Sequence, residues 1–598
     1  MHAPLAGEHL VLRASSQPSA WSGGMLSAAR RAHPQVAQGG NPSLGPCAAV
    51  GLWRGFPATT PNGASVPPLQ APAPGLLAVA TLATLAASGR RSGIAPLAHR
   101  RGRRSSLTQR LGVGDPVFAS ILSTQKSWRA AIGEIKAEAN YLIRSYPKKD
   151  WDFGVAFVSG YEGTSIVDVA RALDKELGTK GALLGVAVDG AGGQLIDGSR
   201  GAAKPGEADG IVLTAVQLPE PSEGATGLQR AKPFFIGKKE MMEISQLVCQ
   251  IQGQTRVRGS TDPPTVRAWR RYLGAEEGQP KGILLFVDPM STKFTVQSVL
   301  ASLDLAFPKA VKFGGVCADL LPSQIRVVAA KNGEFVASDE PGIAGLLLPS
   351  SCSVHALTTP GSVSVGPELR VTLAKGQVVK EINDLAATKA LDEVTSEVEP
   401  LQRLLIQRSG FLLGFEAPET VDSTKSKEYD DLWGSSERAP SYAQLAKQAH
   451  GSDWLVRSID PLPNGTIVVQ REDLKRVPRR VGAAWLRCQL HVADHRWARR
   501  EMQLMIQRYL GARMMLSRAT PPIGAIVCAC PSWSSGEEDE EEVGVTELRE
   551  AFGEHLPIAR AVTHGEVAPT GVALGGVDQR RTARLGHTCS CCLLSYEP

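Results

Sequence analysis

The sequence predicts an α/β (mixed α+β) fold: repeated strand-helix-strand-strand units form mixed sheets flanked by helices, in two domains behind a disordered leader. Three observations predict it. Short apolar runs rich in β-branched residues are typical of strands covered on both faces. These runs alternate with segments of helical periodicity, which is the pattern of α/β units. The same order of elements occurs three times, which indicates duplicated units that bury a common core.

The first unit lies between residues 153 and 216. A strand-like run, Phe153–Val158, is followed by the helical pattern of Ile166–Leu177 and by a second strand, Ala182–Val188. A glycine-rich turn then precedes a third strand, Gly210–Val216. The strand runs are continuously apolar, whereas the apolar residues of the helix recur every three to four positions.

The second and third units repeat this order. In each, a strand leads into a helix, a second strand follows, and a further strand closes the unit. The second unit contains Gly282–Val287, Val296–Leu305, Val311–Cys317, Ile325–Ala329 and Gly342–Leu348. The third unit contains Ile523–Cys530, Val545–Phe552, Ile558–Val562 and His587–Leu594. We expect ligand clefts at the junctions between such units.

Two more helices are predicted outside the repeats. After Ser127, the spacing of Trp128, Ile132 and Ile135 indicates a helix. A second one is predicted over Asp494–Leu510, where apolar residues share one face and Asp494 is placed to cap the first turn.

The first 114 residues have the composition of a targeting leader. They contain eleven arginines, no lysine and one acidic residue, Glu8, for a net charge of +10. Such a segment cannot bury enough apolar surface to offset its chain entropy, so we expect disorder. Arginine-rich leaders that lack acids are typical of organelle transit peptides. The apolar run Leu76–Ala87, followed by Arg90 and Arg91, favours a plastid (chloroplast), with the mitochondrion or the cytoplasm as alternatives.

The remainder of the chain reads as two domains. We predict them at residues 115–395 and 442–598, joined by a connecting segment, 396–415, and a polar linker, 416–441, rich in Ser and charge. The acidic run Glu537–Glu542 is most simply a solvated loop.

Charge and composition exclude several classes of function. Beyond residue 114 the chain holds 54 basic and 58 acidic side chains, a net charge of −4, which argues against a nucleic-acid-binding face. No apolar stretch reaches the ~18 residues of a membrane span. The spacing of the ten cysteines shows no dense disulfide framework, so a reducing compartment is expected.

Short motifs in the first predicted domain resemble the FIST N-terminal domain. The stretch from Phe307-Pro308 through Gly314-Gly315 to Asp319 looks like the family's "FP…GG.a.D" strand. Three other segments resemble its "G..GlaL", "G…vT" and "i.eldg" patterns: Gly342–Leu346, Gly366–Thr372 and Glu381–Asn383.

The second predicted domain resembles the FIST C-terminal domain. Trp454–Ile459 with Gly465 looks like its opening, His564–Pro569 resembles its "GEigP" signature, and His587-Thr588 resembles its closing "H.hT" strand. The resemblance implies a sensory protein that binds small molecules such as amino acids and acts with a signalling partner. We see no F-box-like helical segment before Ser127, so the sequence does not identify the signalling partner.

The resemblance and the residue types give the candidate ligand-binding residues. Glycine pairs can expose backbone N–H groups to a ligand, although each pair alone fits a tight turn. Glu566 is placed to pair with a ligand amine and His564 to hydrogen-bond its carboxylate; the alternative is a hydrogen-bonded turn. The candidates are Gly314, Gly315, Asp319, Arg370, His564, Gly565, Glu566, Pro569 and His587. Arg457 is a further possible partner for a carboxylate.

We expect no metal and no cofactor. Cys589 and Cys591 lie in a Cys-x-Cys pattern on a predicted strand, which lacks the turn that pre-arranges thiolates for zinc. No frame of a nucleotide-binding loop or of a known hydrolase is present.

The interpretation is therefore a small-molecule-binding sensory protein, with amino acids or similar metabolites as the expected ligands. The residues favour a binding role over an enzymatic one. The alternatives are an enzyme of unknown reaction that uses Cys317 or the His564/Glu566 pair, and an adaptor that binds a protein partner.

Overall fold

The computed structural model describes eighteen stretches of the chain. They are residues 115–144, 150–161, 164–177, 182–195, 200–203, 209–221, 227–243, 264–276, 278–293, 296–318, 325–331, 334–336, 341–416, 454–469, 486–515, 520–533, 542–576 and 582–597. The predicted leader lies outside them, as do all of the polar linker except Glu416 and all of the acidic run except Glu542.

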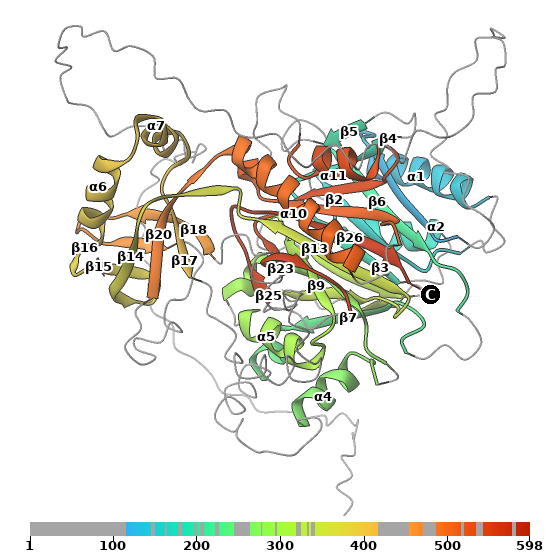
Figure 1. The fold of residues 1–598 in the computed structure, drawn as a ribbon. Helices are drawn as coiled ribbons and strands as arrows, with labels where there is room; N and C mark the ends of the chain where they lie inside the picture. Colours follow the sequence, from blue (N-terminus) through green and yellow to red (C-terminus); the bar gives the residue numbers. More distant parts are fainter. Residues whose placement is uncertain are drawn as a thin grey trace, which may run out of the picture. The chain divides into compact units, whose positions relative to one another are not determined.

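The largest sheet has thirteen described strands (Figure 1). In spatial order they are β11 (Glu334–Val336), β10 (Val327–Lys331), β3 (Ala182–Ala187), β2 (Phe153–Ser159), β6 (Gly210–Gln217), β1 (Val117–Ser123), β4 (Gly190–Leu195), β22 (Ile558–Val562), β21 (Gly524–Ala529), β26 (Cys589–Tyr596), β13 (Cys352–Thr359) and β24 (Gly571–Ala573), with β5 (Arg200–Ala203) paired to β4. The first unit of the sequence occupies one half of this sheet and the third unit the other half.

A second sheet of six described strands carries the second unit. Its order is β25 (Thr582–Arg584), β23 (Glu566–Pro569), β9 (Val311–Val316), β8 (Gly282–Val287), β12 (Gly342–Leu347) and β7 (Lys232–Gly237). Strands β23 and β25 come from the C-terminal part of the chain, so this sheet joins segments about 250 residues apart in sequence.

The third sheet is antiparallel throughout and closes on itself. Its order is β14 (Ser362–Lys375), β20 (Leu486–Ala493), β17 (Leu412–Glu416), β18 (Trp454–Pro461), β19 (Ile467–Val469), β15 (Val378–Ile382) and β16 (Leu385–Ala386). Because β14 also pairs with β15, the first six strands form a ring. Alternating apolar side chains fill it, together with α6 (Ala387–Glu397) and α7 (Pro400–Ser409).

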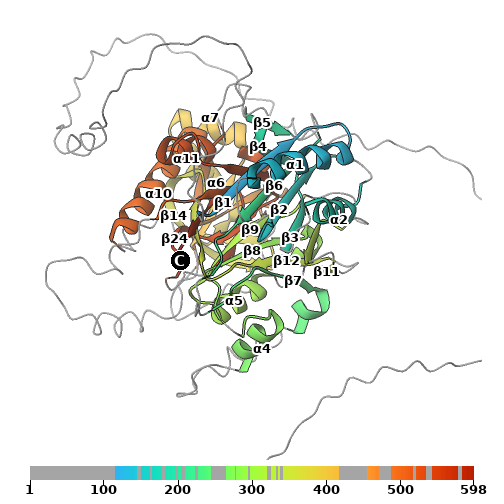
Figure 2. The same cartoon turned by 90° about the vertical axis from the view of Figure 1, so that its right-hand side faces the viewer.

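The two larger sheets pack face to face between helices (Figure 2). On the outer face of the thirteen-stranded sheet lie α1 (Trp128–Ile143) and α2 (Ile166–Leu177) over the first unit, and α10 (His495–Met515) and α11 (Val545–Phe552) over the third. On the outer face of the six-stranded sheet lie α4 (Pro264–Tyr272) and α5 (Val296–Ala306). The architecture is thus helix, sheet, sheet, helix.

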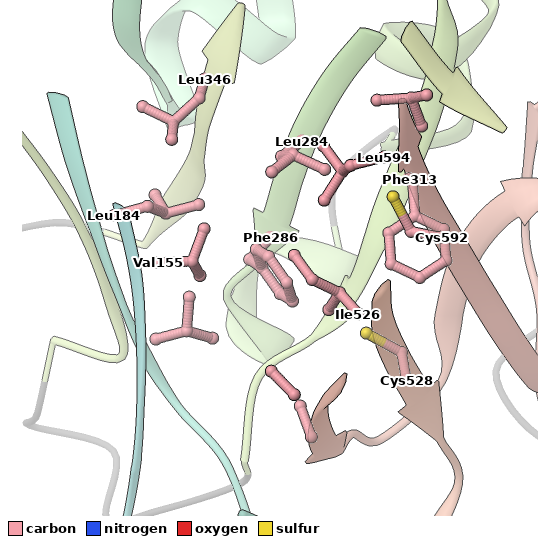
Figure 3. Close-up of a cluster of buried hydrophobic side chains, with 14 of the residues drawn as sticks. Val155, Leu184, Leu284, Phe286, Phe313, Leu346, Ile526, Cys528, Cys592 and Leu594 are labelled. Carbon is pink, nitrogen blue, oxygen red and sulfur yellow. The ribbon is translucent and has the colours of Figure 1, made fainter. Parts of the chain in front are cut away.

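Apolar side chains from both sheets form the core between them (Figure 3). Phe286 and Phe313 of the second unit meet Val155 of the first and Ile526 of the third. The rings of Phe157 and Phe286 stack edge to face with their centroids 5.6 Å apart. This core explains the continuously apolar strands, because each such strand is covered on both faces.

The three predicted units share one topology, and the predicted fold class is confirmed. Each contains two parallel strands with a helix between them, and an antiparallel strand beside the first. The resulting spatial orders are β3-β2-β6, β9-β8-β12 and β22-β21-β26. In the second and third units a short 3-10 turn follows the first strand, over Pro289–Lys293 and Pro531–Trp533.

Local signals explain where the predicted helices begin. The carboxylate of Asp494 accepts hydrogen bonds from the backbone N–H groups of Arg496 and Trp497, at 2.9 and 3.3 Å, which confirms Asp494 as the cap of α10. The hydroxyl of Ser165 accepts from the N–H of Val167 at the start of α2 in the same way.

Three details differ from the sequence prediction. The strand predicted at Ile325–Ala329 is β10, and it pairs with β3 of the first unit because the edge of that sheet is open there. The closing strand predicted from His587 begins at Cys589, since His587 has a left-handed φ of 53°. Gly192 and Gly193, expected in a turn, lie within β4, where Gly192 pairs with Arg560.

Strands from the two predicted domains share sheets. Strand β13 pairs with β26, and β14 pairs with β20. The connecting segment predicted at residues 396–415 forms α7 and most of β17, which is a central strand of the ring. The domain boundaries drawn from the sequence remain a prediction.

Candidate functional site

The pairing of β9 with β23 brings the two groups of predicted site residues together. Gly315 lies opposite Glu566, and Gly314 lies opposite Val567. A Cβ atom on Gly314 would come within 1.7 Å of the Leu285 carbonyl oxygen, and one on Gly315 within 2.8 Å of the Thr563 side chain. Both glycines are therefore needed for strands to pack this closely.

Glu566 is the most unusual charged residue of the site because its side chain is completely buried. The hydroxyl of Thr588 donates a hydrogen bond to one carboxylate oxygen. The other oxygen, Oε1, has no hydrogen-bond partner among the described residues. Burial raises the pKa of Glu566 to about 8, against the opposing effect of the hydrogen bond from Thr588. A buried polar atom without a partner costs stability, so Oε1 of Glu566 is a candidate acceptor for a donor group of a ligand.

A small hollow opens on the other side of Thr588. Its cavity volume is about 10 Å³, room for about one water molecule. The residues that line it come from β13, β18, the β23–β24 region and the start of β26: Thr358, Pro360, Trp454, Thr570, Gly571, Leu585 and Thr588. Thr588 thus connects this hollow with the buried carboxyl of Glu566.

Strand β18 of the ring supplies a positive charge to this region. Arg457 is 7% exposed, and its guanidinium donates to the carbonyl oxygens of Val456 and Arg584 at 2.9 and 2.8 Å. Its charge favours the ionised form of Glu566. The neighbouring Ser458 forms a hydrogen bond with Nε2 of His587, which precedes Thr588. Arg457 and His587 therefore hold the chain that positions Thr588.

The carboxyl ends of three parallel strand pairs meet beside this region. Three backbone hydrogen bonds join them in a cycle: Ala318 N–H to Ala187 O at 3.0 Å, His564 N–H to Val316 O at 2.9 Å, and Asp189 N–H to Val562 O at 3.1 Å. In α/β sheets, ligands bind outside the carboxyl ends of parallel strands. The repeat thus converges at the kind of place where ligand sites occur.

Two pairs of polar side chains lie at this convergence. Nε2 of His564 is 2.7 Å from Oδ2 of Asp189, and both side chains are 23% exposed. Arg326 and Asp288 form a buried pair at 3.4 Å. His564 is therefore paired with Asp189, and Glu566 with Thr588, so the sequence-based idea of a catalytic His564/Glu566 pair has no support from the contacts described.

Cys317 also lies at the carboxyl end of β9, with its side chain in the apolar core. Burial and the charge of Asp288 raise the pKa of its thiol well above the usual value. Because the thiolate is the nucleophilic form, this environment opposes thiol catalysis.

The other predicted residues fall outside this region or at its edge. Arg370 is exposed on β14 opposite Arg487, so it belongs to the ring and not to the site. Pro569 ends β23 opposite Thr582, next to Thr570 of the hollow. Gly565, with φ of 128°, makes the turn between His564 and Glu566. Asp319 lies outside the described residues.

Three contributors to the site were not predicted from the sequence. Trp454 walls the hollow, Thr588 bonds to Glu566, and Asp189 pairs with His564. The first two belong to motifs used for the family resemblance, at the opening strand and the "H.hT" strand. Asp189 carries no local signal beyond its place directly after a parallel strand.

Neither a metal centre nor a membrane span emerges from the described stretches. No group of three or more His, Cys, Asp or Glu side chains there is arranged to hold a metal ion. Cys589 and Cys591 share the α10 side of their strand, while Cys592 faces the opposite core. In the same stretches no helix is both long and apolar enough to cross a membrane.

Comparison with known families decides the identity of the first two units. Residues 152–385 match the family model of the FIST N domain. The chain contains a FIST N domain. It runs from the start of β2 to β16, and it includes Asp189, Gly314 and Gly315. No curated protein sequence matches the chain. The FIST C-like resemblance of the later part, which supplies Glu566 and Thr588, remains an inference from sequence.

Proposed function

We propose that this protein is a sensor whose small ligand binds beside Thr588 and Glu566. FIST domains are small-ligand sensory domains of signalling proteins. The observation that carries the proposal is the buried carboxyl of Glu566, which keeps one oxygen without a partner among the described residues and is joined through Thr588 to a hollow. The hollow lies where the FIST N domain meets the later strands.

The ligand class that best suits this site is a small molecule with an ammonium group, such as an amino acid. An ammonium can donate to the unpaired oxygen of Glu566 and compensate its negative charge. The hollow holds about one water molecule in this structure, so the half-buried Trp454 that walls it has to move for an amino acid to enter. Arg457, whose guanidinium donates to two backbone carbonyl oxygens, contributes positive charge that favours a ligand carboxylate nearby.

Binding of a cationic ligand beside Glu566 should release a proton, and this release can be measured. The pKa of Glu566 is about 8, so the group is mostly protonated at neutral pH. A ligand ammonium favours the ionised form and lowers this pKa, and up to one proton is released per ligand bound. Titration calorimetry at pH 7 in two buffers of different ionisation enthalpy measures that release.

The test is a thermal-shift screen of the full chain against the twenty amino acids. At a concentration of 100 Kd a ligand stabilises the folded state by about 2.7 kcal/mol, which raises Tm by a few degrees. Glu566→Gln and Thr588→Val are expected to abolish the shift. Asp168→Asn, an exposed change on α2 (side chain 57% exposed), is the matched control and should leave it intact. The proposal fails if no amino acid raises Tm, or if both site variants respond as the wild type does.

Three further attributes are proposed with this function. The segment from residue 442 onward acts as a FIST C-like domain, the leader directs the protein to a plastid, and a protein partner carries the signal onward. Import assays with and without residues 1–114 test the second. The third is developed next.

A further inference from the structure

Helix α10 presents an apolar stripe to solvent. Its inner face packs Ala498, Met502, Met505, Ile506 and Tyr509 against the thirteen-stranded sheet. On the outer face, Trp497, Leu504 and Met515 are 39%, 41% and 66% exposed. At about 100° per residue they fall within about 20° of one line along the helix. Large apolar side chains aligned in this way on a solvent-exposed helix face are typical of a docking surface.

The stripe is bordered by positive charge. Arg496 and Arg500 are exposed on the same side, and within the described residues neither forms an ion pair. The acidic residue of the helix, Glu501, is 8% exposed and points inward, where Thr359 donates to it. Gly511 on the outer face leaves room, because a Cβ atom there would meet nothing within 4 Å. A partner backbone can approach closely at that point.

We propose that α10 is the output surface of this protein and that it binds an amphipathic helix of a partner, with apolar residues flanked by Asp and Glu. The line of apolar side chains is as wide as one helix face, so a second helix can pack on it with its ridges in the grooves of α10. The arginines beside it select an acidic partner. This inference does not rest on the proposed ligand.

Two other occupants fit less well. A second copy of this chain would bring the same arginines to the interface, and one helix face supplies much less than the ~800 Å² per partner of a stable dimer. A lipid surface binds amphipathic helices that are free to sink into it, whereas the inner face of α10 is fixed on the sheet.

The position of α10 also suits an output role. Glu501 is hydrogen-bonded to Thr359, and the residues on either side of Thr359, Thr358 and Pro360, line the hollow. The backbone N–H of Gly361 donates to the same threonine hydroxyl at 3.1 Å. One hydrogen-bonded side chain, that of Thr359, thus joins the edge of the hollow to the helix.

The test uses a designed peptide and the full chain. The probe is a fluorescent, acetylated helical peptide of about six turns with leucines on one face and glutamates beside them. A charge-reversed control peptide carries lysines in place of the glutamates. Fluorescence anisotropy should show at least tenfold tighter binding of the glutamate peptide, weakened by salt. Leu504→Gln and Arg500→Glu should each weaken binding at least fivefold. Leu401→Gln on α7, where the leucine is 67% exposed, is the control and should not.

Three results would overturn the inference. The first is equal affinity for the two peptides, or affinity unchanged by both α10 variants. The second is binding of phosphatidylserine vesicles but not of the peptide, which would make the stripe a membrane face. The third is a dimer in sedimentation that Leu504→Gln dissociates. Circular dichroism of each variant establishes that the fold is intact, and Arg500→Gln repeats the charge test with a milder change.

Discussion

At the scale of single residues, Glu566 links stability to pH. Its pKa is about 8 in the folded protein, raised by burial from an ordinary value of 4.5. Between these two values the unfolded chain has lost this proton while the folded protein keeps it. Stability contributed by this group is therefore complete below pH 4.5 and is lost as the pH rises toward 8.

We predict that Glu566→Gln flattens the pH dependence of unfolding. In the wild type the free energy of unfolding should fall by up to about 1.4 kcal/mol per pH unit from this group between pH 5 and pH 8. Glutamine has no proton to lose, so the difference between variant and wild type should grow in favour of the variant across that range. Urea unfolding at pH 5, 6, 7 and 8 measures it. Glu368→Gln, an exposed change on β14, is the control, and identical slopes for Glu566→Gln and wild type would contradict the burial argument.

At the scale of elements, strand β9 is fixed by a buried ion pair. The ammonium of Lys312 is fully buried, lies 3.0 Å from Asp304 of α5, and donates to the Phe307 carbonyl oxygen at 2.6 Å. Asp304 also accepts hydrogen bonds from the hydroxyl and the N–H of Thr582 on β25. This network joins α5, β9 and β25 around the strand that carries Gly314 and Gly315.

We predict an asymmetry between the two partners of this pair. Asp304→Asn keeps an acceptor for Thr582 but leaves the buried ammonium without its counter-charge, and should cost about 3–5 kcal/mol. Lys312→Met replaces the buried charge by an apolar side chain and leaves a partly exposed carboxylate, so it should cost clearly less. Urea unfolding of both variants and of the double variant measures the difference. A larger cost for Lys312→Met would show that the hydrogen bond to Phe307, not the charge, dominates.

Element types were predictable from sequence, but pairing was less so. The apolar runs and the helices between them predict the three parallel strand pairs, because a strand–helix–strand connection can be folded into few topologies. The same patterns do not say that β10 adds to the first unit, or that β13 lies beside β26, since antiparallel edges accept any strand of suitable register. The ring of β14, β15 and β17–β20 was not foreseen, because the pattern of its short strands does not say which of them pair.

The part of the site that lies in recognisable sequence motifs was predictable. Gly314, Gly315, Gly565 and Glu566 were expected together and do lie together across two paired strands. Asp189 reaches His564 only through the fold, from a segment about 375 residues earlier. Arg370, predicted with them, lies on β14 of the ring opposite Arg487, because an arginine after a glycine motif gives no information about which sheet it joins.

At the scale of the whole molecule, the thirteen-stranded sheet is completed by β26, the last of its described strands in sequence order. Strand β26 lies between β21 and β13, and it pairs with β13 along all eight of its residues. Its side chains alternate between the two cores, with Cys592 on one side and Cys591 on the other. Glu597, just after it, pairs with Lys281 at 2.9 Å and Arg513 at 3.2 Å.

We predict that a chain ending at Gly586 does not reach the native fold. It lacks β26, so β21 and β13 lose the strand that pairs with both of them. The apolar clusters on the two faces of the sheet also lose the side chains that β26 contributes. Near-ultraviolet circular dichroism and limited proteolysis should show loss of fixed packing, and a synthetic peptide of residues 587–598 should restore it by strand addition. A chain ending at Glu597, which keeps β26 and both ion pairs of Glu597, is the control and should fold. Native packing of the shorter chain would contradict the central role of β26.

The placement of β26 has a consequence for biosynthesis. β13 and β21 are synthesised before the strand that lies between them, so each keeps one unpaired backbone edge until β26 is added. We therefore expect a nascent chain to expose open β-edges until residues 589–596 have left the ribosome, and to bind chaperones that shield such edges during that interval.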